Sequence, residues 1–223
     1  MLKVSEIFVS IQGEGIDVGR VASFIRFTGC PLKCRFCDTQ YAKTGGSLFS
    51  IEELIFRLEK LGFSDIVVTG GEPLVQDEIE SFIVELSKKD WVRKIFIETC
   101  GIFFKKDVFT DKVFLNISPK PPSMMDIDAK RLLDGYISLF PDRVNVKFLF
   151  ANEKDFLFAM DIVNENIDFF QKNGIVFQPV ELPGEDYVES VRKVIDFIKR
   201  NKAVVSKFEV KIIPQIHKLL GIK

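Results

Sequence analysis

The sequence predicts an α/β fold, a partial (β/α)6-type barrel that resembles an incomplete TIM barrel. Apolar, β-branched runs alternate with amphipathic stretches along the 223 residues, which favours a parallel sheet covered by helices. Runs such as 175–180 are apolar at consecutive positions, as expected of strands that are buried on both faces. About six strand–helix units follow one another, fewer than the eight that close a barrel.

The helix and strand signals follow in a regular order. The clearest helix signal begins at Ser50, a typical N-cap, with Glu53 three residues later and Gly62 at its end. Further helices are expected at 76–89, 126–136, 153–174 and 185–201. Strands are expected at 21–30, 65–71, 92–101, 112–122, 143–150, 175–180 and 208–213, with the segment 214–221 after the last of them.

Composition and charge limit the classes of function. No linker or repeat divides the chain, so we expect one domain over 1–223, with a cysteine loop at 28–41 and a C-terminal extension at 207–223. The net charge is −1, with basic and acidic residues interspersed, which argues against a nucleic-acid or membrane-surface partner. No apolar run reaches the roughly 18 residues of a membrane span, and no signal-peptide pattern opens the chain. A cytoplasmic, reducing location is therefore expected.

Motifs rich in Gly and Pro follow several of the expected strands. In parallel α/β sheets and barrels, ligands bind beyond the carboxyl ends of the strands. The motifs therefore indicate one common site, and they are TGGEP at 69–73, ETCG at 98–101, SPKPP at 118–122 and FQPV at 177–180.

Three cysteines, Cys30, Cys34 and Cys37, lie within eight residues. In a reducing compartment such a group indicates a metal or redox site rather than disulfides. A structural zinc site needs a fourth protein ligand, for which the chain offers only Cys100 and His217. Three thiolates can instead hold three irons of a [4Fe–4S] cluster and leave one iron for an outside ligand. A zinc or redox loop remains the alternative at this point.

The spacing C-x3-C-x2-C resembles the signature of the radical S-adenosylmethionine (SAM) superfamily. VTGGEP at 68–73 resembles its second motif, a Gly-rich turn that binds the amino group of SAM. Glycines let the backbone approach a ligand closely. The resemblance implies a radical SAM fold in which the amino and carboxylate groups of SAM chelate the open iron.

The chain as a whole resembles the 7-carboxy-7-deazaguanine synthase family of this superfamily. The matching motifs run in the family's order over essentially the whole chain: SIQGEG at 10–15, CDT at 37–39, TGGEP, ETCG, SPK, FQP and PQIHKLLG at 214–221. The resemblance implies a carbon–nitrogen lyase that converts 6-carboxy-5,6,7,8-tetrahydropterin to 7-carboxy-7-deazaguanine. In the family, the radical derived from SAM removes hydrogen from C6, the ring contracts with loss of ammonia, and Mg²⁺ is required.

Residue chemistry in the first motif suits such a substrate. The amide of Gln12 and the carboxylate of Glu14 match the adjacent donors and acceptors of a pterin edge, although QGEG by itself also reads as a hairpin turn. Arg26 can pair with a substrate carboxylate, and a strand residue that faces solvent would look the same. By resemblance, the substrate contacts are Gln12, Gly13, Glu14, Arg26 and Thr69.

The remaining site residues are also assigned by resemblance. Thr39 matches the family position whose hydroxyl binds Mg²⁺, a hard cation that normally keeps several waters. The predicted SAM contacts are Phe36, Asp38, Gly71, Ser118, Pro119, Lys120 and Gln178. Cys100 reads as a buried thiol, and His217 as either a structural residue or an acid–base group.

Other interpretations stay open on the sequence. A glycyl-radical activating enzyme also uses C-x3-C-x2-C, and a non-catalytic zinc- or cluster-binding protein is a third reading. The family resemblance further implies a homodimer and an electron donor such as flavodoxin or ferredoxin. It leaves open whether the product feeds queuosine in transfer RNA or another deazapurine pathway.

Overall fold

The computed structural model describes residues 1–125 and 133–222. Its strands are β1 (Leu2–Ile11), β2 (Val21–Phe27), β3 (Ser47–Phe49), β4 (Asp65–Gly70), β5 (Lys94–Thr99), β6 (Val113–Ile117), β7 (Val144–Phe150), β8 (Ile175–Pro179) and β9 (Val210–Ile212). Its α-helices are α1 (Ile51–Leu61), α2 (Ile79–Ser87), α3 (Leu133–Leu139), α4 (Glu153–Glu165), α5 (Ile167–Asn173), α6 (Tyr187–Arg200), α7 (Lys202–Val205) and α8 (Ile216–Leu220).

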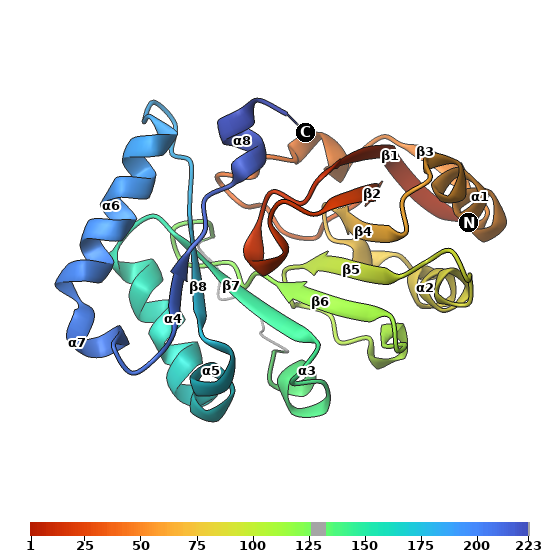
Figure 1. Cartoon of the computed structure of the whole chain (residues 1–223). Coiled ribbons are helices and arrows are strands. Elements are labelled where there is room, and N and C mark those ends of the chain that lie inside the picture. Colours follow the sequence, from red (N-terminus) through yellow and green to blue (C-terminus); the bar gives the residue numbers. More distant parts are fainter. Residues whose placement is uncertain (126–132, 223) are drawn as a thin grey trace.

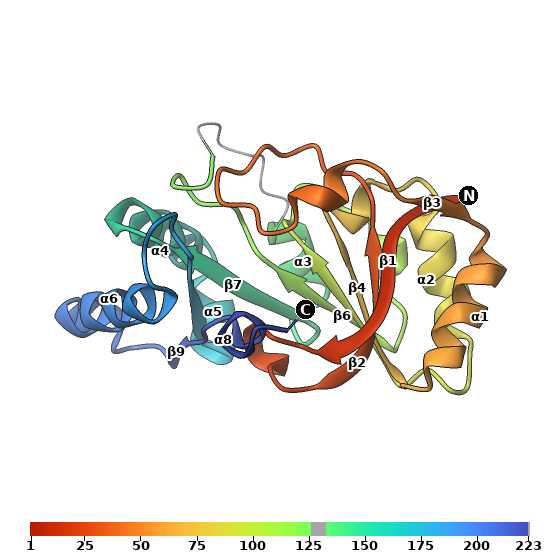
Figure 2. The same ribbon diagram turned by 90° about the horizontal axis from the view of Figure 1, so that it is seen from above.

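The strands form one sheet in the order β3-β1-β2-β4-β5-β6-β7-β8-β9. β1 is antiparallel to both β2 and β3, and every other neighbouring pair is parallel. The sheet curves around an interior, with α1 to α7 outside it (Figure 1) and α8 beside the turn between β1 and β2 (Figure 2). The predicted α/β fold, a partial barrel of the radical SAM type, is confirmed.

The outer helices bury one face each against the sheet. α1 begins and ends as the sequence predicts: the Ser50 hydroxyl accepts a hydrogen bond from the N–H of Glu53, and Gly62 is the C-cap. Its buried residues are Leu54, Ile55 and Leu58, which share a face at helical spacing. In residues 1–125 and 133–222, no helix is long and apolar enough to cross a membrane.

The structure differs from the expected elements in several places, and β3 and α7 were also not predicted. The first ten residues after Met1 form β1, which was not predicted, and QGEG lies in its turn to β2. The expected helix at 153–174 breaks at Asn166, whose side chain donates to Ile162 O and to Asp134; such local bonds compete with the helix. Only a 3₁₀ turn, Lys106–Val108, lies between β5 and β6. The first part of the helix expected at 126–136 falls outside the described residues.

The interior of the barrel holds two layers of side chains in register. The lower layer is apolar, and it consists of Phe24, Val67 and Phe96, with Ala22, Phe8 and Phe114 around them. Residues two positions further along a strand point to the same face. They form a polar upper layer of Arg26, Thr69, Glu98 and Asn116. The apolar layer therefore closes the bottom of the barrel, and the polar layer faces the carboxyl ends of the strands.

Candidate active site at the carboxyl ends of the strands

A cavity of about 390 Å³ opens at the carboxyl ends of the strands. Fifteen of the sixteen predicted site residues line it: Gln12, Gly13, Glu14, Arg26, Cys30, Cys34, Phe36, Cys37, Asp38, Thr39, Thr69, Gly71, Ser118, Lys120 and Gln178. Pro119 is buried and does not belong to the lining. Five segments that are far apart in the sequence thus meet at one place, as the Gly- and Pro-rich motifs predict.

The cysteine loop packs directly on the TGGEP turn. The N–H of Glu72 donates to Gly29 O at 2.9 Å. A Cβ on Gly71 would lie 2.5 Å from Gly29 O and 2.7 Å from Cβ of Cys30. Only glycine leaves room for this contact, so position 71 is constrained by the cysteine loop itself as well as by any ligand.

The three loop cysteines have free thiols and are partly buried. Burial raises the pKa of Cys30 and of Cys34, and Lys120 partly offsets this for Cys34. Coordination to iron reverses that preference, because a thiol bound to a metal is deprotonated. The Thr39 hydroxyl is 3.7 Å from Sγ of Cys37. The donor set of three thiols on one loop fits a cluster ligated by three cysteines.

Cys100 lines the same cavity, but it is hydrogen-bonded to Glu72. Its thiol and its N–H both donate to Oε2 of Glu72, each at 2.8 Å. Burial and this carboxylate strongly raise the pKa of the Cys100 thiol. The thiol is therefore a protonated hydrogen-bond donor, which argues against a fourth thiolate of a zinc site.

Glu72 joins two of the motifs. It is fully buried, and it accepts hydrogen bonds from the N–H of Leu74 at 3.0 Å and from the hydroxyl of Thr99 at 2.9 Å, besides those of Cys100. A buried carboxylate with this many donors is well compensated. It braces TGGEP at the end of β4 against ETCG at the end of β5.

Three predicted SAM contacts, Ser118 and Lys120 directly after β6 and Gln178 on β8, line the same cavity as the TGGEP turn. Lys120 donates to the hydroxyl of Ser118 at 3.4 Å. Gln178 is 2% exposed, and its Oε1 is buried without a hydrogen-bond partner in the described part of the chain. Because buried polar atoms are normally paired, Gln178 marks a place where a ligand with an N–H or O–H donor fits.

The turn between β1 and β2 carries Gln12 and Glu14. It is a hairpin, closed by hydrogen bonds from Gln12 N–H to Arg20 O and from Gly19 N–H to Gln12 O, each 2.7 Å. QGEG is therefore a hairpin turn that also forms part of the cavity wall. The interpretation as a turn and the interpretation as a substrate-binding motif are compatible. The Gln12 amide donates to Glu98 at 2.7 Å and accepts the N–H of Glu14 at 3.2 Å, which fixes the orientation of the amide.

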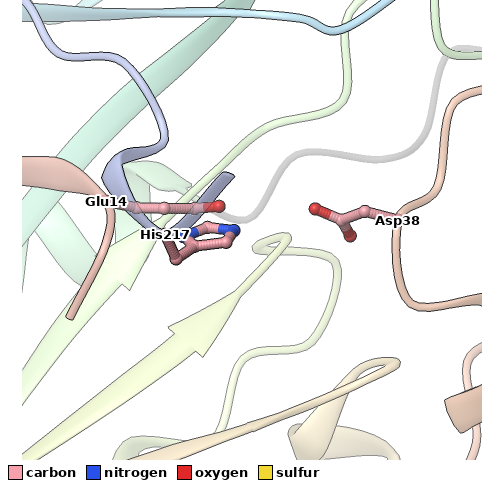
Figure 3. Close-up of side chains that lie close together, drawn as sticks. All are labelled: Glu14, Asp38 and His217. Atoms are coloured by element: carbon pink, nitrogen blue, oxygen red, sulfur yellow. The ribbon is translucent and has the colours of Figure 1, made fainter. Parts of the chain in front are cut away.

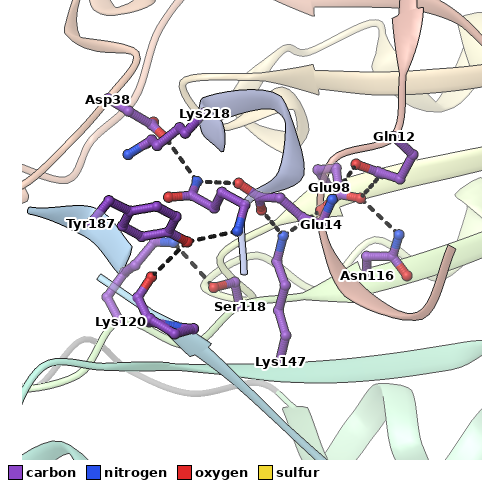
Figure 4. Close-up of polar contacts among 12 residues, drawn as sticks. Gln12, Glu14, Asp38, Glu98, Asn116, Ser118, Lys120, Lys147, Tyr187 and Lys218 are labelled. Atoms are coloured by element: carbon purple, nitrogen blue, oxygen red, sulfur yellow. Dashed lines mark hydrogen bonds and ion pairs between the residues drawn. The ribbon is translucent and has the colours of Figure 1, made fainter. Parts of the chain in front are cut away.

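Glu14 is held from two sides. Its carboxylate accepts hydrogen bonds from Nζ of Lys147 on β7 and from Nε2 of Gln215, just before α8 (Figure 4). Burial alone would raise the pKa of Glu14, but the charge of Lys147 and these hydrogen bonds outweigh it and lower the pKa to about 2. Glu14 is therefore an ionised acceptor at neutral pH.

Glu14, Asp38 and His217 come together at the mouth of the cavity (Figure 3). Their ligand atoms lie within 4.8 Å of one another. Burial lowers the pKa of His217, so its imidazole is neutral at pH 7. Such donors suit a divalent cation in general, but the Lys147 ammonium already occupies Glu14 and disfavours a second cation there. We therefore interpret the group as a set of acceptors around a polar ligand.

Arg26 and Thr69 sit side by side in the upper layer, on β2 and β4. Nε of Arg26 donates to Glu6 at 2.8 Å, and the Tyr41 hydroxyl donates to the same carboxylate at 2.7 Å. Arg26 lines the cavity instead of facing solvent. A carboxylate ligand would have to bind the terminal nitrogens of Arg26, because Nε is engaged.

Several polar residues of this site were not predicted from the sequence, among them Glu98, Lys147 and Gln215 in the cavity lining and Asn116, which donates to Glu98. Glu98 and Lys147 carry a signal that would have found them, because each is a charge that follows several apolar residues or lies between them, in IFIET and VNVKFLF. Charges in such strands are rarely buried unless they are paired. Gln215 gives no comparable signal, since its place depends on how α8 docks.

The comparisons with known proteins agree with this geometry. The Radical SAM superfamily model matches residues 24–198. The 7-carboxy-7-deazaguanine synthase of Thermoplasma acidophilum is 31% identical over 97% of this chain and 96% of its own, and that of Clostridium acetobutylicum is 33% identical over 98% and 95%. The crystal structure of QueE from Escherichia coli has a TM-score of 0.71 at 24% identity, covering 97% of this chain and 94% of that one.

A second solved structure, Streptococcus suis SuiB bound to S-adenosylmethionine, has a TM-score of 0.55 at 13% identity and covers 84% of this chain and 45% of that one. At such identities the two structures speak for the fold alone. The fold and the matched model define a radical SAM protein. On the identity and coverage of its relatives, the chain belongs to the 7-carboxy-7-deazaguanine synthase family.

Proposed function

We propose that this protein is a 7-carboxy-7-deazaguanine synthase, which converts 6-carboxy-5,6,7,8-tetrahydropterin to 7-carboxy-7-deazaguanine with loss of ammonia. One observation carries the proposal. The cysteine loop, the TGGEP turn, the buried Gln12 and the partly buried Glu14 all line a single cavity. The near full-length similarity to synthases of this name supports the same substrate.

The site suits the two cofactors of the superfamily. Cys30, Cys34 and Cys37 would hold a [4Fe–4S] cluster, and Gln178, with its unpaired carbonyl oxygen, is among the residues that would contact SAM. When bound, the cluster and SAM supply the radical chemistry of the reaction. The chain positions these ligands, and Gly71 and Glu72 hold the TGGEP turn against the cysteine loop.

The substrate contacts follow from the chemistry of the polar layer. A pterin has ring N–H and amino donors next to each other on its pyrimidine edge, and the ionised carboxylate of Glu14 accepts such donors. Arg26, which also lines the cavity, would receive the 6-carboxylate through its terminal nitrogens. Holding the ring at both ends fixes C6 relative to SAM, and such positioning supplies much of the rate and selectivity.

We also propose that the hydroxyl of Thr39 binds Mg²⁺ together with substrate oxygens. Thr39 lines the cavity next to the cysteine loop, and a hard cation with one protein oxygen, waters and substrate oxygens is ordinary chemistry for Mg²⁺. Thr39→Ala is expected to keep the cluster but to lose the dependence of turnover on Mg²⁺. An unchanged Mg²⁺ response in this variant would refute the assignment.

Turnover under anaerobic conditions tests the function. The reconstituted protein, SAM, reductant, Mg²⁺ and the carboxypterin are expected to give 7-carboxy-7-deazaguanine beside 5'-deoxyadenosine, detected by mass spectrometry. Deoxyadenosine without the deazaguanine would move the assignment to another radical SAM reaction, such as glycyl-radical activation. Neither product, from protein with a verified cluster, would favour a non-catalytic metal-binding protein.

The setting of the enzyme is part of the proposal. A reducing cytoplasm suits the free thiols of the cluster loop. We further propose a homodimer, a small electron donor such as flavodoxin or ferredoxin, and a product that enters queuosine or a related deazapurine. Sedimentation of the holoenzyme tests the dimer. Turnover with purified flavodoxin or ferredoxin in place of a chemical reductant tests the proposed electron donor.

A further inference from the structure

A buried ion-pair bridge lies beneath the proposed substrate contacts (Figure 4). Lys147 is 5% exposed. Its Nζ donates to Glu14 on the hairpin turn and, at 3.1 Å, to Glu98 on β5. Neither Lys147 nor Glu98 is among the site residues predicted from the sequence.

Glu98 in turn organises the polar layer. Its Oε1 accepts hydrogen bonds from Gln12 and from Asn116, both at 2.7 Å. Asn116 is itself oriented by Asn145, whose amide donates to Asn116 Oδ1 at 3.0 Å. The bridge contacts Gln12 through Glu98 and Glu14 through Lys147, and the three neighbouring strands β5, β6 and β7 fix its position.

The charges of the bridge do not cancel. Two carboxylates share one ammonium, so the group carries one net negative charge and lies in the cavity wall. Burying an unpaired carboxylate is costly, whereas a carboxylate paired with an ammonium in good geometry is tolerated. Lys147 therefore helps Glu14 to stay ionised at a partly buried place, and the surplus negative charge favours a ligand edge that presents N–H donors.

We propose that Lys147 is a positioning residue for the substrate, which acts through Glu14: it anchors the Glu14 carboxylate to Glu98 and thereby sets the affinity for the carboxypterin. The inference rests on the proposed function, because it takes the carboxypterin as the ligand of Glu14. It assigns no contact between Lys147 and SAM or the cluster, and it predicts that their binding does not depend on Lys147.

The test is a double-mutant cycle on the holoenzyme, measured as the Kd of 6-carboxytetrahydropterin by anaerobic calorimetry with SAM but without reductant. Lys147→Met is expected to weaken this binding about 10- to 100-fold, the size of a lost charge-assisted contact. The Kd of SAM and the iron content are expected to stay within about twofold. In a Glu14→Gln background, Lys147→Met is expected to add less than about threefold, because coupled residues are not additive.

Two further variants keep the test decisive. Lys105→Met removes another lysine that pairs with a carboxylate, Glu80, outside the cavity, and it is expected to bind the carboxypterin as the wild type does. If Lys147→Met does not fold, the double variant Lys147→Met/Glu98→Gln is used, because it restores the single net negative charge of the bridge. The double variant is expected to show the same loss of affinity for the carboxypterin. Lys147→Arg keeps the charge and is expected to recover part of the binding.

Three outcomes would overturn the inference. The first is wild-type affinity for the carboxypterin in Lys147→Met or in the double variant. The second is a full, additive loss in the Glu14→Gln background, since Lys147 would then act independently of Glu14. The third is an equal loss of SAM affinity, which indicates general damage. Wild-type protein that neither binds nor converts the carboxypterin would instead contradict the proposed function.

Discussion

A Cβ atom on Gly13 would lie 2.1 Å from Nδ1 of His217, so the turn between β1 and β2 packs directly against α8. The N–H of Ile216 also donates to Gly13 O at 2.9 Å. Residues from the two ends of the chain thus form one wall of the cavity. The C-terminal helix is held by the same turn that carries Gln12 and Glu14.

Gly13→Ala is therefore expected to displace the imidazole of His217 and to weaken carboxypterin binding, by roughly tenfold for the loss of about one good hydrogen bond. The cluster and the affinity for SAM are expected to stay unchanged. Kinetic measurement of KM checks the prediction. His217→Ala is the matched background, because removing the ring relieves the contact. A Gly13→Ala effect that is undiminished in that background would contradict the steric explanation.

Cysteine substitutions separate the cluster ligands from the fourth thiol. Cys34→Ala is expected to lose the iron–sulfur absorbance and turnover together, because three thiolates are needed to hold the cluster. Cys100→Ser keeps a hydrogen-bond donor to Glu72 and is expected to retain about four irons per chain, the content of one intact cluster. Iron analysis after anaerobic reconstitution checks both. Loss of iron in Cys100→Ser would make Cys100 a ligand after all.

Glu72→Gln tests the hydrogen bonds by which Glu72 links TGGEP to ETCG. The amide places an NH₂ group among the donors of Leu74, Thr99 and Cys100, so at least one buried donor loses its acceptor. We expect a loss of about 2–4 kcal/mol in the free energy of unfolding and weaker SAM binding. Urea unfolding and SAM calorimetry measure the two effects. Wild-type stability in this variant would show that the brace is unimportant.

The sequence predicts part of the fold and of the site, namely the features that depend on local patterns. The cysteine loop, TGGEP and the α1 caps are local patterns, and the structure places them as expected. β1 was missed because its register depends on β2 and β3, and the break at Asn166 depends on a contact with Asp134. Lys147 and Glu98 come together only when β5 and β7 are placed in the barrel, although each stands out as a charge that follows several apolar residues or lies between them.

A buried ion pair at the opposite end of the strands gives a stability prediction that is separate from catalysis. Asp65 begins β4 and binds Arg93 at 2.6 Å and Arg20 at 2.8 Å. Burial alone would raise the pKa of Asp65, but the two guanidinium groups outweigh it and lower the pKa below its ordinary value of 3.8. A lowered pKa stabilises the fold above 3.8, and this stabilisation disappears as the pH falls through the lower, folded-state pKa.

Asp65→Asn is accordingly expected to cost about 1–2 kcal/mol of unfolding free energy near pH 7, the size of lost charge-assisted hydrogen bonds, because Arg93 and Arg20 are partly exposed and stay hydrated. The difference from the wild type is expected to shrink below about pH 4. Urea unfolding at a series of pH values measures this. The substitution lies outside the cavity, so the KM for carboxypterin is expected to stay the same. A stability difference that persists unchanged at acidic pH would contradict the assigned role of the Asp65 charge.

The proposed function requires this cavity to hold the carboxypterin with C6 next to SAM. Substrate deuterated at C6 tests this with reconstituted enzyme, SAM, reductant and Mg²⁺, and mass spectrometry reads the deuterium in 5'-deoxyadenosine and in the recovered SAM. Loss of ammonia converts the carboxypterin to the deazaguanine without net oxidation or reduction, so the hydrogen taken from C6 has to be replaced by one from deoxyadenosine. We expect the label in deoxyadenosine or in SAM, together with 7-carboxy-7-deazaguanine. Deazaguanine formed while both deoxyadenosine and SAM stay unlabelled would contradict this placement of the substrate.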